Sequence, residues 1–297
     1  MSLIVRNVRH LSELLFHQKY GQATIRPMTK PAFSLEVEKI TAHCSPPART
    51  IAVEVVAETG STNADLLARL DHLQQPTLLI AETQTAGRGR AGRSWLSAPG
   101  ASLTFSLAWR FPCAPQALLG LPLAIGVALA EALAKLDVLV QLKWPNDVLK
   151  EGKKLAGVLI ETAQLANSAS HVQQTWAVVG IGLNLLLPEE LERQIDRPVA
   201  DAAWLAQMER NQLLARLLDH LAQCLQQFSA HGFAPFVDRW NAFHAYAGQQ
   251  VHILDGGVVT QQGRALGVDK SGCLLLQDQQ GLIHTVMAGD VSLRPSY

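Results

Sequence analysis

The residues with the clearest capacity for chemistry form a run of glycines and arginines, GRGRAGR, from Gly87 to Arg93. Glycine lets the backbone curl so that N–H groups converge on an anion, and Arg88, Arg90 and Arg93 would add charged donors. The run directly follows TLLIAET, an apolar segment with the composition of a strand. It is suited to a phosphate or a carboxylate, while a solvated basic loop or a contact to RNA stays open.

Two further segments carry charge at the edges of apolar runs. The segment Lys143-Trp144-Pro145-Asn146-Asp147 ends a strand-like run, where α/β-type folds tend to place functional groups. The alternative for this segment is a turn with a surface ion pair. Lys154 opens another apolar run, and its side chain either extends into solvent or reaches into a site beside the strand.

Together these three segments hold the cations, glycines and candidate Mg²⁺ carboxylate that are needed to handle a nucleoside triphosphate. The Walker sequence G-x-x-x-x-G-K-[ST] does not occur, so the chain is not a P-loop enzyme. The sequences G-x-S-x-G and H-E-x-x-H are also absent, as is a plausible Cys/His pair. A reaction driven by positioning and charge neutralisation, without a covalent enzyme intermediate, fits this pattern.

Two polar segments lie at the ends of other apolar runs. ETGSTN, from Glu58 to Asn63, precedes a helical pattern, so Ser61 or Thr62 is a credible helix N-cap. The same hydroxyl and amide groups could bind a polar ligand head at the helix N-terminus. GIGLN, from Gly180 to Asn184, ends a strand-like run, and Asn184 could meet a phosphate or ribose there; a plain glycine turn is the alternative.

The elements that must position these groups alternate between strand-like and helical patterns after Ile51. This alternation indicates an α+β or α/β fold and not a helical bundle. Residues 1–48, punctuated by four prolines, have the character of an extension or peripheral element. Strand-like runs begin at residues 51, 77, 103, 139, 155 and 176, and helical ones at 62, 117 and 210.

The pattern changes after Gly248 to short apolar runs separated by glycine-containing turns. Such spacing is typical of a small terminal β-barrel of roughly 50 residues. The domain boundaries expected are 1–48 for the extension, 49–247 for the catalytic domain and 248–297 for the barrel.

Composition narrows the class of protein. The 297 residues are 48% hydrophobic, with 25 Lys and Arg against 25 Asp and Glu. Zero net charge gives no general attraction to nucleic acid or to an anionic membrane. The four cysteines stand apart, which argues against a zinc site or disulfide framework and favours the cytoplasm. The longest uncharged stretch, 116–130, is interrupted by glycine and proline, and it is expected to form a buried helix.

Five segments, in this order and spacing, resemble the biotin protein ligase family, also called biotin–[acetyl-CoA-carboxylase] ligases. Members activate biotin with MgATP to biotinyl-5′-AMP and transfer the biotin to one lysine of a biotin carboxyl carrier domain. The resemblance implies an α+β fold, with a class II synthetase-like central mixed sheet, flanking helices and a small SH3-like C-terminal barrel. The segments are ETGSTN (58–63), QTAGRGRAGRSW (84–95), KWPNDV (143–148), KLAGVLIE (154–161) and GIGLN (180–184).

The resemblance also implies roles for individual residues. Lys154, Arg90 and Arg88 would be catalytic, with Lys154 neutralising charge on the reacting carboxyl and α-phosphate oxygens. Asp147 is the candidate for Mg²⁺ or ribose, Trp95 would pack against adenine, and the segment after Pro188 would order over the adenylate. The biotin pocket would comprise Ser61, Thr62, Asn63, Gln84, Gly87, Arg88, Gly89, Arg90, Lys154 and Gly157. The ATP and adenylate contacts would be Arg93, Trp95, Lys143, Asn146, Asp147, Asn184 and Arg294.

The N-terminus departs from one branch of the family, whose bifunctional members carry a winged helix-turn-helix and repress the biotin operon. Only 60 residues precede Ser61 and a recognition helix is hard to place in them, so we expect a monofunctional cytoplasmic ligase that binds no nucleic acid and no membrane. We expect a homodimer only by analogy with the family. Two other hypotheses for the function stay open, namely a lipoate-type acyl ligase and a non-catalytic biotin-sensing regulator.

Overall fold

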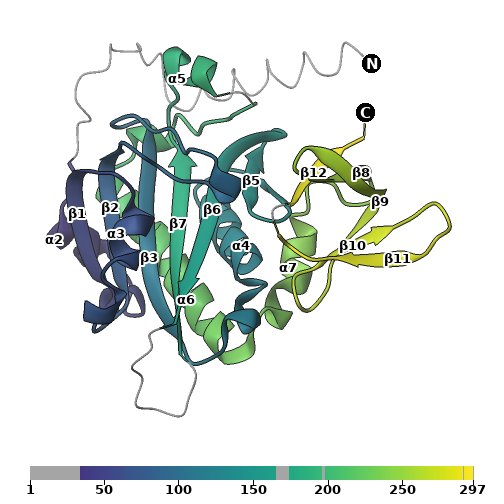
Figure 1. The fold of residues 1–297 in the computed structure, drawn as a ribbon. Coiled ribbons are helices and arrows are strands. Elements are labelled where there is room, and N and C mark those ends of the chain that lie inside the picture. Colours follow the sequence, from purple (N-terminus) through teal and green to yellow (C-terminus); the bar gives the residue numbers. More distant parts are fainter. Residues whose placement is uncertain (1–33, 165–173, 196–197, 290, 297) are drawn as a thin grey trace. The chain divides into compact units, whose positions relative to one another are not determined.

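A computed structural model of the chain describes residues 34–164, 174–195, 198–289 and 291–296. The expectation of a peripheral segment at residues 1–48 therefore lies partly outside the described residues. Strands and helices alternate along the chain and build two sheets with covering helices (Figure 1).

The central sheet has seven strands in the order β1-β2-β3-β7-β6-β5-β4. The β1–β2 pair is parallel and the other neighbouring pairs are antiparallel, so the sheet is mixed, as the family resemblance implies. Its strands are β1 (Ala52–Thr59), β2 (Thr77–Gln84), β3 (Ser102–Phe111), β4 (Gln141–Lys143), β5 (Asp147–Lys150), β6 (Lys153–Ala163) and β7 (Thr175–Asn184).

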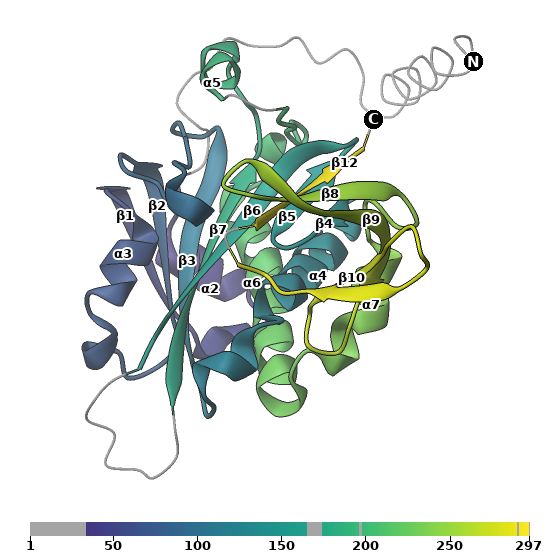
Figure 2. The ribbon, with the colours of Figure 1, turned by 45° about the vertical axis from the view of Figure 1, so that its right-hand side comes forward.

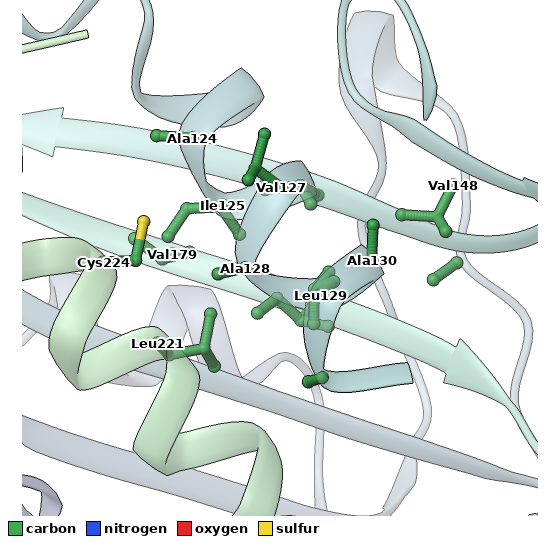
Figure 3. Packing of buried hydrophobic residues seen from close by; sticks show 14 of the residues in the cluster. Ala124, Ile125, Val127, Ala128, Leu129, Ala130, Val148, Val179, Leu221 and Cys224 are labelled. Atoms are coloured by element: carbon green, nitrogen blue, oxygen red, sulfur yellow. The ribbon is translucent and has the colours of Figure 1, made fainter. Parts of the chain in front are cut away.

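Apolar side chains cover both faces of this sheet. Within β2, Leu78 and Ile80 join one buried cluster and Leu79 joins the other, as the two-residue period of a strand requires. The larger cluster contains the inward residues of α2 (Val37–His43), α4 (Leu121–Ala134) and α6 (Arg210–His231). Figure 3 shows Ala124, Ala128 and their neighbours beside Leu221 and Cys224. The smaller cluster includes Leu66 of α3 (Thr62–Leu67), on the opposite face.

Helix α4 is the element that could be mistaken for a membrane span. An 18-residue window within Pro115–Ala134 has a mean hydropathy of 2.0, so the stretch could cross a membrane by length and composition alone, but 72% of this window is buried inside the protein. The helix is apolar all round because it packs between the sheet, α6 and α7 (Val237–Ala242). This confirms the expected buried helix, which begins at Leu121 after a short 3₁₀ turn, Pro115–Leu118.

The C-terminal region forms a second, antiparallel sheet with the strand order β11-β10-β9-β8-β12 (Figure 2). Its last strand, β12, pairs with its first strand, β8, and Leu293 lies opposite Ile253. The structure bears out the expected run of short strands. They are β8 (Gln250–Asp255), β9 (Val258–Val268), β10 (Leu274–Gln277), β11 (Ile283–Val286) and β12 (Val291–Pro295).

The structure corrects the expected peripheral character of residues 34–48. Helix α2 packs on α6, and Leu35, Ile40 and Ala48 are buried in the same core as the central sheet. Asn211, at the start of α6, accepts a hydrogen bond from the Glu36 backbone and donates one to the Ser34 carbonyl. The described part of this segment therefore belongs to the compact unit that runs to the C-terminus.

Smaller differences concern the lengths of elements. The helical pattern from residue 62 divides into α3 and a 3₁₀ turn, Leu70–His72, and the run at 139 is only three residues of strand. Strand β5 and helix α5 (Glu189–Gln194) are additional to the sequence prediction. Further short 3₁₀ turns are Ala48–Thr50, Arg90–Gly92, Leu205–Gln207 and Ala234–Phe236.

Candidate active site

A cavity of about 440 Å³ lies where β6, β7, the start of α3 and the arginine loop meet residues of β12. Residues from each of the five sequence segments singled out above line it, with polar side chains from four of them and Gly180, Ile181 and Gly182 from GIGLN. The predicted site residues that line it are Ser61, Thr62, Asn63, Gln84, Arg88, Gly89, Arg90, Arg93, Trp95, Lys143, Asn146, Asp147, Lys154, Gly157 and Arg294.

One end of the cavity is a hydrogen-bonded group of hydroxyl and amide side chains at the start of α3. The Ser61 hydroxyl is the N-cap and accepts from the Ala64 N–H at 3.5 Å, which settles which residue caps the helix. The Thr62 N–H donates to Gln84 Oε1 at 2.8 Å, and the Asn63 Oδ1 accepts from the Ser106 hydroxyl at 2.5 Å. This end can therefore hold a polar ligand head by hydrogen bonds alone.

The arginine loop is a small hairpin that closes on itself. The Gly89 N–H donates to the Arg93 carbonyl at 2.6 Å and the Trp95 N–H to the Gly87 carbonyl at 2.9 Å. The expectation that backbone N–H groups converge on an anion is wrong for these two, because carbonyls of the loop already accept from them. Positive φ at Ala91 and Gly92 makes the tight turn. The arginine side chains are the charged donors that the loop carries into the cavity.

The floor of the cavity consists of strand glycines, on which side chains from elsewhere lie. A Cβ at Gly182 would collide with the Trp95 indole, and one at Gly157 would approach the Lys154 Nζ to 2.8 Å. The Lys154 ammonium also lies 5.7 Å from the centre of the Trp95 ring, within range of a cation–π interaction. The Trp95 Nε1–H is buried without a hydrogen-bond acceptor among the described residues.

The turn between β4 and β5 brings the second cationic segment to the same place. Asp147 forms an ion pair with Lys154, which answers the question whether Lys154 reaches into a site. Asn146 holds the turn against β6, because its Nδ2 donates to the Val158 carbonyl at 2.7 Å. Its Oδ1 accepts from Arg90 Nη1 at 3.0 Å, which links the turn to the arginine loop.

Two contacts connect the cavity to the C-terminal region. The Arg90 guanidinium donates to the Gly289 carbonyl as well as to Asn146, and Arg294 of β12 lines the cavity. Arg90 therefore holds the arginine loop, the β4–β5 turn and the segment before β12 together.

Two predicted residues do not line the cavity. Gly87 is buried beneath the loop, where a Cβ would collide with the Trp95 carbonyl. The Asn184 side chain is buried and donates to the Ala200 carbonyl at 3.0 Å, so it fixes the segment after α5 instead of facing the cavity. The region after Pro188 holds helix α5, and residues 196–197 of it lie outside the described residues.

Sequence reasoning missed four residues of this site, namely Ser106, Glu161, Gly180 and Gly182. Ser106 and Glu161 complete the hydrogen bonds around Asn63, and a Cβ at Gly180 would collide with the Asn63 carboxamide. The alternating glycines of GIGLN carried a signal, since glycine within a strand indicates the close approach of another group. Ser106 carried none, because one serine in an apolar strand has no distinctive pattern.

Few of the described side chains in the cavity could coordinate a metal ion. In the parts of the chain that the structure describes, no group of three or more His, Cys, Asp or Glu side chains could hold a metal ion. Asp147 is the one carboxylate among the described lining residues. Mg²⁺ commonly takes one or two carboxylates and completes its coordination with phosphate oxygens and water. The set therefore fits Mg²⁺ that enters with a nucleotide.

Comparisons with known proteins agree with this geometry. A model described as the biotin/lipoate A/B protein ligase family matches residues 53–184, and one described as the biotin protein ligase C terminal domain matches residues 246–294. The bifunctional ligase/repressor BirA of Escherichia coli (strain K12) is 36% identical over 249 residues, covering 82% of this chain and 74% of the relative. The biotin–[acetyl-CoA-carboxylase] ligase of Mycobacterium tuberculosis is 38% identical, covering 80% and 88%.

A solved structure shows the same arrangement of elements. The biotin protein ligase of Aquifex aeolicus in complex with biotin and ATP is 30% identical, with a TM-score of 0.67, covering 82% of this chain and 99% of that one. The fold and the site thus define a protein ligase of the biotin/lipoate A/B family, and the chain belongs to this family. Its relatives named here are biotin ligases, and its C-terminal region matches the biotin protein ligase C terminal domain.

Proposed function

We propose that the chain activates biotin with ATP and transfers the biotin to a lysine of the biotin carboxyl carrier protein of acetyl-CoA carboxylase. In the first step a biotin carboxylate oxygen attacks the α-phosphorus of ATP and pyrophosphate leaves, forming biotinyl-5′-AMP. In the second, the lysine amine attacks the acyl carbon, AMP leaves, and the amine loses a proton as the amide forms. The observation that carries this proposal is one cavity that joins a neutral polar end to a cluster of cations.

The two ends of the cavity suit the two ends of biotin. Ser61, Thr62, Asn63 and Gln84 would bind the neutral ureido head, since the side chains there are hydroxyls and amides. Arg88, Arg90 and Lys154 would then bind the carboxylate and later the acyl phosphate. Gly89 and Gly157 would leave room for the ligand beside the loop and the strand.

The adenylate half of the site would use residues toward β12. Trp95 would pack against adenine, and Arg93, Lys143, Asn146 and Arg294 would contact ATP or the adenylate. Asn184 would act indirectly, because its hydrogen bond to the Ala200 carbonyl fixes the backbone that pairs with Lys154.

Charge neutralisation explains how this arrangement lowers the barrier. The attacking carboxylate and the α-phosphate are both anionic, so positive groups fixed before the reaction stabilise the transition state more than they stabilise the separate reactants. The Trp95 ring and the backbone pairing at residues 198–200 hold Lys154 in place, and Asp147 pairs with its ammonium before the nucleotide binds. Little reorganisation would remain when the reacting groups meet.

Mg²⁺ would be held by Asp147 and by the oxygens of the nucleotide, and when bound it neutralises charge on the phosphates and on the leaving pyrophosphate. Asp147 would exchange its contact with Lys154 for the metal or the ribose. Lys154 would then be available to the reacting oxygens.

We also infer the domain architecture from the family. Its members have a class II synthetase-like central sheet and an SH3-like C-terminal sheet, and we place the boundary of the C-terminal domain at residue 248, just before β8.

The location and assembly of the protein are proposals as well. Four free thiols, Cys44, Cys113, Cys224 and Cys273, accord with a reducing cytoplasm. The ligase activity is proposed without a repressor function, and a homodimer stays an expectation.

The experiment is to incubate the purified chain with biotin, MgATP and a biotin carboxyl carrier domain, and to measure pyrophosphate release and the mass of the carrier. A mass increase equal to one bound biotin, absent when lipoate replaces biotin, supports the proposal. Carrier modification with lipoate in place of biotin would make the chain a lipoate-type ligase. Absence of both signals would favour a biotin-sensing regulator, for which operator binding at low salt is the assay.

A further inference from the structure

We propose that Glu161, which the sequence motifs do not mark as a ligand-binding residue, positions the biotin head group by fixing the direction of the hydrogen bonds around it. The inference rests on the proposed function and names a specificity-determining residue of the same site. Glu161 lies on β6, and its side chain is 23% exposed.

Both carboxylate oxygens of Glu161 have partners from different elements. Asn63 Nδ2, in the first turn of α3, donates to Oε2 at 2.9 Å. The Arg88 guanidinium, from the arginine loop, donates to Oε1. An ionised carboxylate only accepts hydrogen bonds, so its two partners must both be donors.

This requirement, together with a longer bond of 3.5 Å from Asn63 Nδ2 to the Leu159 carbonyl, fixes the orientation of Asn63. With its Nδ2 directed at Glu161, its Oδ1 faces Ser106 and accepts from that hydroxyl at 2.5 Å. Gly180 leaves the space for this arrangement, since a Cβ there would collide with the Asn63 Oδ1. The carboxamide is therefore held at its nitrogen, at its oxygen and by the strand behind it.

The same direction of hydrogen-bond donation includes Thr62, the neighbour of Ser106. Ser106 has one hydroxyl hydrogen, which it gives to Asn63, so at 2.6 Å it accepts from the Thr62 hydroxyl, whose one hydrogen has a second acceptor in Gln84 Oε1, 3.1 Å from Thr62 Oγ1. The Thr62 N–H donates to Gln84 Oε1, which leaves the Gln84 Nε2 end on the side of Gly87. Glu161 thus favours one donor-to-acceptor direction through Asn63, Ser106 and the Thr62 hydroxyl, whereas the Thr62 backbone N–H orients Gln84.

Burial stabilises this arrangement of donors and acceptors. Ser106 is 0% exposed, and Thr62 and Asn63 are each 3% exposed, so water cannot readily replace a lost partner. In such an environment an unsatisfied or reversed group costs more than at the surface, and neighbouring hydrogen bonds depend on one another. The pattern of donors and acceptors offered to a ureido group consequently depends on the charge of Glu161.

Glu161→Gln is the direct test. An amide has one acceptor end and one donor end, so either Asn63 or Arg88 would face a donor. We expect the dissociation constant for biotin and the KM for biotin to rise by about ten- to a hundredfold, the size of a lost hydrogen bond to a charged group. The KM for ATP should stay within about twofold of wild type, a split that general loss of folding would not give.

Glu54→Gln is the matched control. Glu54 is a half-exposed carboxylate on β1 whose two oxygens both accept from the Arg69 guanidinium, at 3.2 Å and 2.5 Å. Biotin affinity should be unchanged in this variant. Thermal denaturation of every variant shows whether its fold is retained.

Coupling to Ser106 tests the chain of hydrogen bonds. Ser106→Ala removes one hydroxyl and keeps the Cβ, and we expect biotin binding to weaken while ATP binding does not. The double variant should bind biotin about as weakly as the weaker single variant, because either change interrupts the same chain. If Glu161→Gln proves unfolded, Ser106→Ala decides the question by the same split between the two KM values.

The outcomes separate the two proposals. Wild-type protein that binds no biotin in calorimetry overturns both of them. Wild-type protein that binds biotin, together with unchanged affinity in Glu161→Gln or strictly additive effects of the two substitutions, overturns the role of Glu161 alone. A rise of both KM values together would mark Glu161 as a general structural residue and likewise overturn the proposal.

Discussion

The Trp95 indole lies directly on the backbone of Gly182, at the floor of the cavity, where a Cβ would occupy the position of the ring. Trp95 reaches this position from the end of the arginine loop, and the Lys154 ammonium lies over the same ring. The absence of a side chain at Gly182 therefore helps to place the group that we propose for charge neutralisation.

The first prediction concerns this contact. Gly182→Ala should displace Trp95 and lower the rate of biotin-dependent pyrophosphate release by at least about tenfold, since small displacements of positioned groups carry large kinetic costs. Gly60→Ala is the control, because a Cβ there meets nothing within 4 Å. An unchanged rate in Gly182→Ala would show that the indole position does not matter for the chemistry.

The second prediction concerns Lys154. Replacement by alanine should lower adenylation by about two to three orders of magnitude, as expected for the loss of a preorganised charge-stabilising donor. Pyrophosphate release in single-turnover conditions is the measurement. Lys153→Ala, which removes an exposed neighbouring cation, should have little effect. Near wild-type release by Lys154→Ala would refute the catalytic role.

The third prediction concerns retention of the intermediate. Arg90→Ser removes the hydrogen bonds to Asn146 and to the Gly289 carbonyl, so the arginine loop should loosen and release biotinyl-5′-AMP. Free adenylate in the ultrafiltrate should exceed that of wild type and of Arg216→Ser, an exposed arginine on α6. The idea fails if the intermediate stays bound to the Arg90→Ser variant.

The fourth prediction concerns pH and stability. Burial lowers the pKa of His244 from 6.5 to about 4, and neither ring nitrogen has a hydrogen-bond partner among the described residues. Between these values the unfolded chain binds a proton that the folded chain does not, so the free energy of unfolding should fall as the pH falls from about 6.5 to 4. The loss should be on the order of 3 kcal/mol.

His244→Phe isolates this contribution, because phenylalanine can still pack on Trp240, whose ring centre lies 4.7 Å from that of the imidazole. Urea denaturation of both proteins at pH 7 and pH 4.5 measures the difference. Equal pH dependence in the two proteins would contradict the assignment to His244.

The amino-acid sequence was sufficient to predict the elements whose signals are local. The hydroxyls before α3 predict its N-cap, because a capping bond joins residues only three apart. The length of the hydrophobic stripe predicts α6, and the alternation of patterns predicts an α+β or α/β fold, while the mixed sheet followed from the family resemblance. The binding segments were identified by the order and spacing of five segments that resemble one family, since each segment alone also fitted a solvated loop, a turn or a cap.

Tertiary structure alone decided which of these groups meet. Asn63 faces Gly180, and Trp95 faces Gly182, through strand register and packing between distant segments, and no local pattern encodes such a pairing. The same applies to Asn184, which holds the Ala200 backbone, and to α2, a short helix stabilised by burial of Ile40 against α6. Sequence thus determined the chemical groups and their local conformations, whereas long-range packing determined the direction in which each group points.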